Sequence, residues 1–102
     1  MKRVYLIQSL ENSYYKIGVS KDPKKRIKQL QTGNSSELKL VESYPSDFAH
    51  QIEKTLHRRY SHLQREGEWF DMGISNEVSF VQECQKIEET LIFLKKNSTV
   101  FI

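Results

Sequence analysis

The chain of 102 residues contains a single cysteine, Cys84, and no long hydrophobic run. One cysteine cannot form an intrachain disulfide, and it excludes a zinc site built from several thiolates. We therefore expect a reducing, cytoplasmic (intracellular) environment by default. Because no apolar stretch approaches the roughly 20 residues that span a bilayer, we expect no membrane partner. Gln8 and Ser9 also interrupt the amino terminus too early for a secretory apolar segment.

Internal repeats, low-complexity linkers and the length for a second domain are absent too. Apolar residues make up 37% of the chain and charged residues 28%, so the composition is that of an ordinary small globular domain. We expect one domain over residues 1–102, with a core at about 3–71 and a C-terminal covering helix at about 76–96.

The net charge of +3 is modest, but it is unevenly distributed. Residues 1–65 carry 13 Lys and Arg against 6 Asp and Glu, whereas residues 66–102 carry 3 against 7. The first part therefore has a net charge of +7 and the second part −4. This split favours one face for phosphate and another for solvent or a partner, unless it is a random feature of a small protein.

Three segments of alternating β-prone and polar residues predict strands, over Lys2–Gln8, Tyr14–Ser20 and Leu38–Tyr44. The connection between the first two is short turn material, which predicts that they pair in an antiparallel manner. Between the second and third strands, Asp22 and Pro23 predict a helix start, because aspartate caps free N–H groups and proline loses no hydrogen bond there. That helix should end near residue 32, at a glycine.

Two further helices are predicted from apolar residues that recur every three or four positions. One begins around residues 45–47 and ends near residue 62, and the other covers about 76–96. The apolar stripe of the first consists of Phe48, Ile52, Leu56, Tyr60 and Leu63, and that of the second of Val78, Val81, Cys84, Ile87, Leu91 and Leu94. The element order predicts an α+β fold with a small three-stranded antiparallel sheet flanked by helices, a β-β-α-β-α core plus a C-terminal helix.

Three side chains suggest a site on this fold. Tyr5 and Lys16 are 11 residues apart, and Lys16 and Arg26 are 10 apart. A strand, a turn, a second strand and a helix start would bring all three into one region. A phenol, an amine and a guanidinium placed together form an anion site, and nucleic acid is the commonest polyanion.

With this element order, the sequence resembles the GIY-YIG nuclease superfamily, and more closely its compact phage and bacterial branch. The resemblance covers residues 3–71, about two-thirds of the chain. It rests on the strands Arg3-Val4-Tyr5 and Lys16-Ile17-Gly18, on Arg26 in the first helix, on Glu53 in the second, and on the motif Gly67-Glu68-Trp69-Phe70. Arg3 stands where the name-giving glycine would be, and Lys16 where the second tyrosine would be.

The resemblance implies a divalent-metal-dependent endonuclease that hydrolyses DNA phosphodiester bonds. Glu53 would hold one Mg²⁺ or Mn²⁺, which favour oxygen ligands, and Arg26 would bind phosphate oxygens in pairs. Either Tyr5 or Lys16 would take the proton of the attacking water, and we favour Tyr5 as the base with Lys16 as its electrostatic partner. His57 is expected to act in the second sphere of the metal or to contact phosphate.

An alternative metal site follows from helix geometry. His50, Glu53 and His57 fall along one helix face, and two histidines flanking a carboxylate suit a transition metal such as zinc. No further cluster of cysteine and histidine supports it, so we favour the oxygen-ligated metal.

Nucleic acid, DNA rather than RNA, is the expected partner. The expected phosphate contacts are Lys24, Lys25 and Lys28 on the first helix, and Arg58 and Arg59 on the second. Trp69 and Phe70 could stack on bases or anchor the core, and a core anchor is the more usual role. Glu68 is either an accessory carboxylate of the site or a partner for Arg65 or another basic side chain.

Two other classes of function fit parts of the same sequence. One is a non-catalytic nucleic-acid-binding module on the same scaffold, in which Tyr5 packs, Glu53 is a solvated helix charge and Arg26 is a surface cation. The other is an interaction domain that uses the C-terminal helix and the apolar tail ending in Phe101-Ile102, for example to form a homodimer. A helix that simply closes the core is the plainer interpretation of that region.

Overall fold

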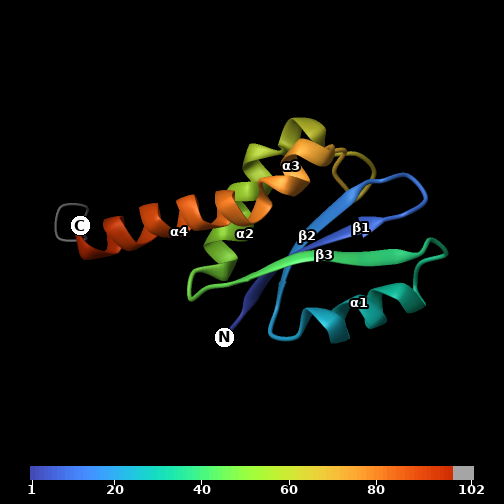
Figure 1. Ribbon diagram of the computed structural model, residues 1–102, viewed down its shortest axis with the longest axis horizontal. Helices are drawn as coiled ribbons and strands as arrows, with labels where there is room; N and C mark the ends of the chain where they lie inside the picture. Colours follow the sequence, from blue (N-terminus) through green and yellow to red (C-terminus); the bar gives the residue numbers. More distant parts are fainter. Residues whose placement is uncertain (98–102) are drawn as a thin grey trace.

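A computed structural model describes residues 1–97, which form a three-stranded antiparallel sheet with helices on both faces (Figure 1). In chain order the elements are β1 (Arg3–Ser9), β2 (Tyr15–Ser20), α1 (Pro23–Thr32), β3 (Leu38–Pro45), α2 (Ala49–Arg59), the 3₁₀ turn η1 (Ser61–Leu63), α3 (Ile74–Val78) and α4 (Phe80–Lys96). The predicted α+β class, with a C-terminal helix after the β-β-α-β-α core, is confirmed.

Strand β1 is the centre of the sheet, because the strand order is β2-β1-β3. It pairs antiparallel with both neighbours, and Tyr5 lies opposite Gly18 on one side and Ser43 on the other. Its residues from Val4 to Ile7 are all buried. Strand β2 is therefore an edge strand, and one side of its backbone is available to other parts of the chain.

The two faces of the sheet are covered by different helices. Alternation along β1 sends Val4 and Leu6 into the main core, where they join Ile52 and Leu56 of α2 and Phe80 of α4. Tyr5 and Ile7 alternate to the opposite face, which α1 covers (Figure 1). Helix α1 contributes Ile27 and Leu30, which are half-buried. The sheet is thus a partition between a large core and a thin one.

The helix start predicted at Asp22 is confirmed by its hydrogen bond. The Asp22 carboxylate accepts from the backbone N–H of Lys25 at 3.1 Å, and Pro23 is the first residue of α1. The second helix begins later than predicted, because Phe48 is its N-cap and Ser46 holds the entry by accepting from the Phe48 N–H at 3.0 Å. It also ends earlier, and the 3₁₀ turn η1 replaces its predicted last turn.

The predicted C-terminal helix is two helices. Ser79 separates α3 from α4, and Phe80, directly after the break, is completely buried. The prediction that Val78 belongs to the buried stripe was wrong, because its side chain is 78% exposed. The break changes the helical phase, so that Phe80 instead of Val78 enters the core. Cys84 and Ile87 lie in the core as predicted.

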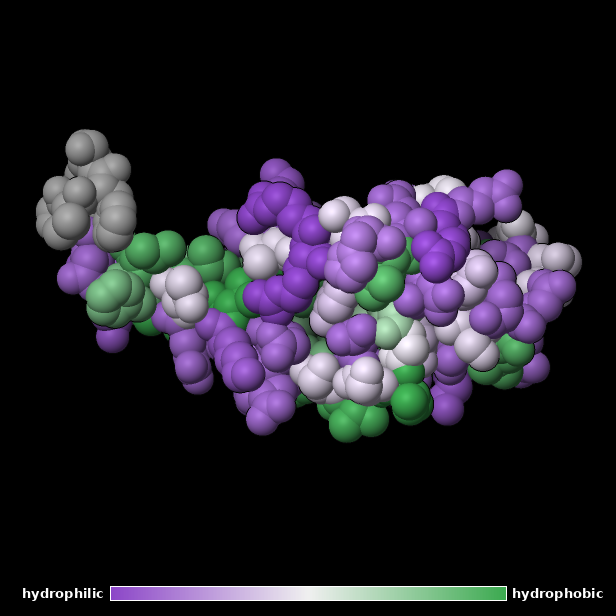
Figure 2. Space-filling model, turned by 90° about the horizontal axis from the view of Figure 1, so that it is seen from above, coloured by the Kyte–Doolittle hydropathy of each residue, from purple (hydrophilic) through white to green (hydrophobic). Residues whose placement is uncertain are grey.

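Helix α4 is fixed to β3 by Glu88 and then extends past the body of the fold. The Glu88 carboxylate accepts from the Tyr44 hydroxyl at 2.7 Å and from the Ser46 hydroxyl. Burial and this carboxylate raise the pKa of Tyr44 to about 12. Beyond this anchor, Ile92, Phe93 and Leu94 are exposed, so the prediction that Leu94 belongs to the buried stripe was also wrong. Figure 2 shows hydrophobic side chains at this end of the molecule.

The apolar tail that ends in Phe101-Ile102 lies outside the described residues, so its proposed use as an interaction surface stays a prediction. Within residues 1–97, none of the helices has the length and apolar character that a bilayer span requires.

Candidate active site

A cleft opens at the free edge of β2, between the layer of α1 and the layer of α2. Its volume is about 400 Å³. The lining residues come from β1, β2, α1, α2 and the loop before α3, and they are Tyr5, Lys16, Ile17, Gly18, Val19, Arg26, Glu53, His57 and Glu68. We call this the β2-edge cleft. It contains all five residues that the sequence analysis assigned to catalysis.

Two other parts of the chain contact the outer edge of β2, which does not pair with β1. Phe70 pairs with Tyr15 through two backbone hydrogen bonds, each 2.8 Å long, and extends the sheet by a short bridge. Two residues further along β2, the imidazole of His57 reaches the backbone carbonyl of Ile17. The Phe70 side chain is 2% exposed and belongs to the core, so its interpretation as a core anchor is confirmed.

Tyr5 is held in the cleft wall by close contact with Gly18. A β-carbon at position 18 would lie 2.2 Å from the Tyr5 hydroxyl oxygen and 2.4 Å from its ring carbon Cζ. Only a residue without a side chain therefore leaves room for the phenol. The Tyr5 hydroxyl makes no hydrogen bond within residues 1–97, yet no fully buried polar side-chain atom there lacks a partner. The hydroxyl thus reaches the cleft surface.

Lys16 and Glu68 form an ion pair at the cleft. The Lys16 ammonium donates to the Glu68 carboxylate at 2.6 Å, and its side chain is 17% exposed against 70% for Glu68. This hydrogen bond and the charge of Lys16 lower the pKa of Glu68, with smaller contributions from His57 and Arg26. Of the two roles considered for Glu68, the structure shows both a carboxylate in the cleft and a basic partner. Arg65 pairs with Asp71 instead.

His57 connects α2 to the edge of the sheet. Its Nε2 lies 2.8 Å from the Ile17 carbonyl oxygen, and a carbonyl can only accept, so Nε2 carries the hydrogen. The imidazole ring packs beside the ring of Phe70, with centroids 5.3 Å apart and planes inclined by 59°. Nδ1 is the nitrogen left for a ligand or a proton.

Glu53 and Arg26 face the cleft from opposite layers. Glu53 is half-buried on α2 and makes no hydrogen bond or ion pair with another residue in the described part of the chain. Arg26 is exposed on α1, and its guanidinium makes a long contact of 3.4 Å with the Gln29 side chain. A free carboxylate and a nearly free guanidinium in one cleft provide separate contacts for a cation and an anion.

The donor set fits a hard divalent cation better than zinc. Mg²⁺ is usually bound by one or two carboxylates, with waters and substrate phosphate completing the shell, and Glu53 offers such a carboxylate. Across residues 1–97, no three His, Cys, Asp or Glu side chains gather where they could hold a metal ion. His50 accepts from the Lys2 ammonium at 2.9 Å, and Nε2 of His57 is engaged with Ile17. The structure therefore does not assemble the zinc alternative.

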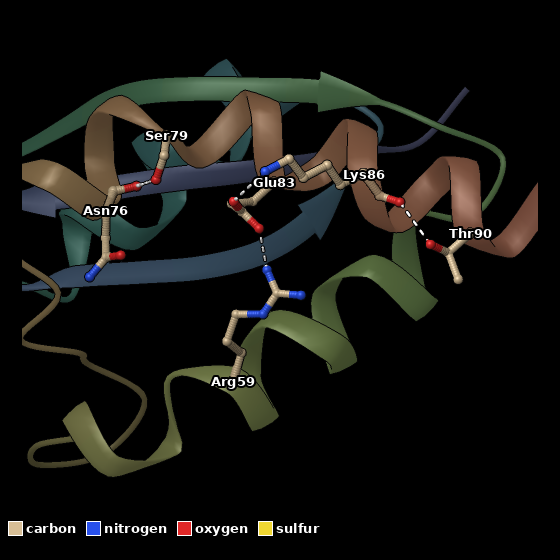
Figure 3. Close-up of polar contacts among 6 residues, drawn as sticks. All are labelled: Arg59, Asn76, Ser79, Glu83, Lys86 and Thr90. Atoms are coloured by element: carbon tan, nitrogen blue, oxygen red, sulfur yellow. Dashed lines mark hydrogen bonds and ion pairs between the residues drawn. The ribbon is translucent and has the colours of Figure 1, made fainter.

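The basic residues predicted to contact phosphate fall into two groups. Lys24, Lys25, Lys28 and Arg58 have exposed side chains. Arg59, by contrast, reaches across to α4 and pairs with Glu83, which also contacts Lys86 at 3.6 Å (Figure 3). Arg59 therefore has its charge neutralised within the protein and does not line the β2-edge cleft.

The steric role of Gly18 is what the sequence analysis missed. The sequence analysis named this glycine only as part of a motif. In the structure Gly18 pairs with Tyr5, and the Tyr5 ring requires the space that a side chain at position 18 would fill. The missing signal was the strand register, since a bulky residue and a glycine opposite each other allow one side chain to lie across the other backbone.

We expect Gly18→Ala to destabilise the fold and to displace the Tyr5 ring, because the new methyl group would overlap the phenol. The cost should be about 1–3 kcal/mol, as for other overpacked sites. Gly33→Ala is the matched control, because a β-carbon there meets nothing within 4 Å and the backbone φ is −99°. Urea unfolding should show a change within about 0.5 kcal/mol for the control. Equal stability of the two variants would contradict the contact.

The Lys16–Glu68 pair makes a prediction about pH. Because the folded-state pKa of Glu68 lies below its ordinary value, the pair stabilises the fold above the unfolded-state pKa. That contribution is lost as the pH falls through the lowered folded-state pKa. In Lys16→Met, the pKa of Glu68 should rise toward its ordinary value, which carboxyl carbon NMR measures. Arg65→Met is the control, and an unchanged pKa of Glu68 in Lys16→Met would refute the assignment.

Comparison with known proteins gives one family. No curated protein and no solved structure matches this chain. The T5orf172 domain matches residues 2–87, which include every residue that lines the β2-edge cleft. This domain is phage-associated and occurs in nuclease-like proteins. Because the match covers well over half of the sequence, the chain belongs to the T5orf172 domain family.

Proposed function

We propose that this protein is a divalent-metal-dependent endonuclease of the GIY-YIG type that hydrolyses DNA phosphodiester bonds. The observation that carries the proposal is the β2-edge cleft, in which side chains from four separate elements meet. Tyr5, Lys16, Arg26, Glu53 and His57 line it together. Membership in a family found in nuclease-like proteins supports the same conclusion.

Phosphodiester hydrolysis needs a base for the attacking water and positive charge near the phosphate. The Tyr5 hydroxyl is the candidate base, because it is fixed by Gly18 and open to the cleft. Arg26 is placed to donate to two phosphate oxygens at once through its planar guanidinium. The fixed position of Tyr5 lowers the entropy cost of reaching the transition state.

Lys16 supplies a second positive charge beside the base. Its pairing with Glu68 holds the ammonium in place, and the low exposure of the Lys16 side chain limits screening by water. An incoming phosphate would compete with Glu68 for this ammonium. Glu68 therefore acts as a positioning group in the free enzyme.

Glu53 is the residue that would hold Mg²⁺ or Mn²⁺. When bound, such a cation supplies Lewis acid chemistry that stabilises negative charge on the phosphate and on the leaving oxygen. The carboxylate of Glu53 is half-buried and has no competing contact among residues 1–97, so it is free for this role. His57 holds α2 against β2 through its Nε2. Its other ring nitrogen, Nδ1, is then the atom that can act in the second sphere of the metal or contact phosphate.

The exposed lysines of α1 and Arg58 of α2 add positive charge to the two helices that also supply Arg26, Glu53 and His57 to the cleft. They suit the phosphates of DNA on either side of the bond to be cut. Such contacts position a substrate without reading its sequence.

The proposal is tested by nicking of supercoiled plasmid in Mg²⁺ or Mn²⁺. Glu53→Gln and Arg26→Ala should each lower the nicking rate by at least about 100-fold, and chelator should abolish nicking. Tyr5→Phe keeps the ring against Gly18, so it should lose about 100-fold or more in rate while unfolding at the same urea concentration. Glu42→Gln, on the exposed edge strand β3, is the matched control and should nick normally.

Two outcomes would contradict this assignment. Nicking by the native protein that survives in Glu53→Gln would place the metal elsewhere. DNA binding that depends on Arg26, without any metal-dependent nicking, would instead identify a non-catalytic binding module on the same fold.

For the exposed end of α4 we propose a homodimer. Ile92, Phe93 and Leu94 lie beyond residue 87, where the family match ends. Glu89 and Lys95 are each three residues from Ile92, so two copies of α4 that cross antiparallel at Ile92 would place opposite charges against each other. Sedimentation velocity should detect a dimer that Phe93→Asp disrupts, whereas monomer alone at high concentration would refute it.

A further inference from the structure

The β2-edge cleft does not end at Lys16, because two further hollows follow it along the surface, one after the other. The first has a volume of about 250 Å³ and shares Lys16 with the cleft. The second has a volume of about 400 Å³ and shares Trp69 and Asn34 with the first. Together they extend the cleft past Lys16 and Trp69 to the β1–β2 turn at Asn12 and Tyr14. We call this extension the Trp69 groove.

Trp69 lines both hollows. Its position is set by the backbone, since Arg65 donates to the Trp69 carbonyl at 2.7 Å and the next residue, Phe70, pairs with Tyr15. The indole is half-buried, and the Lys16 ammonium lies 5.9 Å from the ring centroid. The indole is therefore a fixed aromatic surface beside the proposed catalytic lysine.

The rest of the groove carries groups that suit nucleotides. Tyr14 offers a second, half-buried aromatic ring near the far end. Asn12, Gln29 and Asn34 contribute amides, which can both donate and accept hydrogen bonds. Aromatic rings beside a cationic site are components of a track for single-stranded nucleic acid, and the amides can form hydrogen bonds with base edges.

We infer that the Trp69 groove binds unpaired nucleotides next to the scissile phosphate, with a base stacked on Trp69. A paired base is already stacked within its duplex, whereas an unpaired base has a free face for the indole. The preferred substrate class is therefore nucleic acid with a single-stranded segment adjoining the bond to be cut. This inference rests on the proposed function, because it takes the β2-edge cleft as the site of cleavage.

Trp69 is the only tryptophan in the chain, so its own fluorescence reports on the groove. The native protein, in chelator to prevent cleavage, is titrated with a thymidine oligonucleotide, a blunt duplex, and the same duplex with a single-stranded overhang. We expect the oligonucleotide and the overhang to quench Trp69 emission and the blunt duplex to leave it unchanged. An RNA oligonucleotide of matching length, titrated in the same way, distinguishes single-stranded DNA from single-stranded RNA as the ligand of the groove.

Affinity for a fluorescein-labelled single strand provides the second readout. Trp69→Ala should weaken binding by about 5- to 140-fold, the range expected for loss of one base–aromatic stack. Trp69→Phe, which keeps an aromatic face, should retain most of the affinity. Ile74→Ala is the control, because it removes an exposed apolar side chain on α3 that does not line the groove. If Trp69→Ala fails to fold, Tyr14→Ala takes its place.

The inference is overturned if the single strand does not quench Trp69, or if the blunt duplex quenches it equally. It is also overturned if Trp69→Ala folds and binds the single strand as tightly as the native protein. Failure of the two proposals can be told apart. Nicking without quenching would refute the role of the Trp69 groove and support the nuclease. Quenching without nicking would refute the nuclease and support a groove that only binds nucleic acid.

Discussion

The backbone pairing of Phe70 with Tyr15 is the contact on which the site depends. These two hydrogen bonds attach the loop after α2 to the free edge of β2. The Phe70 side chain closes the core beneath His57, and the two residues before it, Glu68 and Trp69, are thereby set beside Lys16. Without this pairing, the ion pair and the aromatic surface would have no fixed position. An edge strand that would otherwise be open for aggregation is instead used to organise a site.

The sheet register imposes a second constraint. Tyr5 lies opposite Gly18, and the phenol occupies the space where a β-carbon at position 18 would be. This contact fixes the hydroxyl at the cleft surface without a hydrogen bond to any other residue of the described chain. Tyr5 therefore combines two roles, because its ring packs against Gly18 while its hydroxyl stays available for chemistry.

Charge is used differently on the two sides of α2. On the side of the β2-edge cleft, Glu53 and Arg26 make few contacts of their own, and Lys16 is held by an exposed carboxylate that a phosphate can replace. On the side of α4, Arg59 is paired with Glu83 and serves to attach the two helices (Figure 3). Basic residues one position apart, Arg58 and Arg59, thus differ in role because successive helix positions face different neighbours.

The sequence alone determined the element order, the fold class and the helix cap at Asp22, because hydrophobic periodicity and capping chemistry are local. It also indicated five of the nine residues that line the β2-edge cleft. The spacing along strands and helix indicated Tyr5, Lys16 and Arg26, whereas Glu53 and His57 came from the family resemblance and their shared helix face. Only the tertiary structure decided that Glu68 pairs with Lys16 and that Arg59 pairs with Glu83 of α4. It also decided that the C-terminal helix breaks at Ser79. These outcomes depend on which side chains distant in sequence come together, and local propensity carries no information about such contacts.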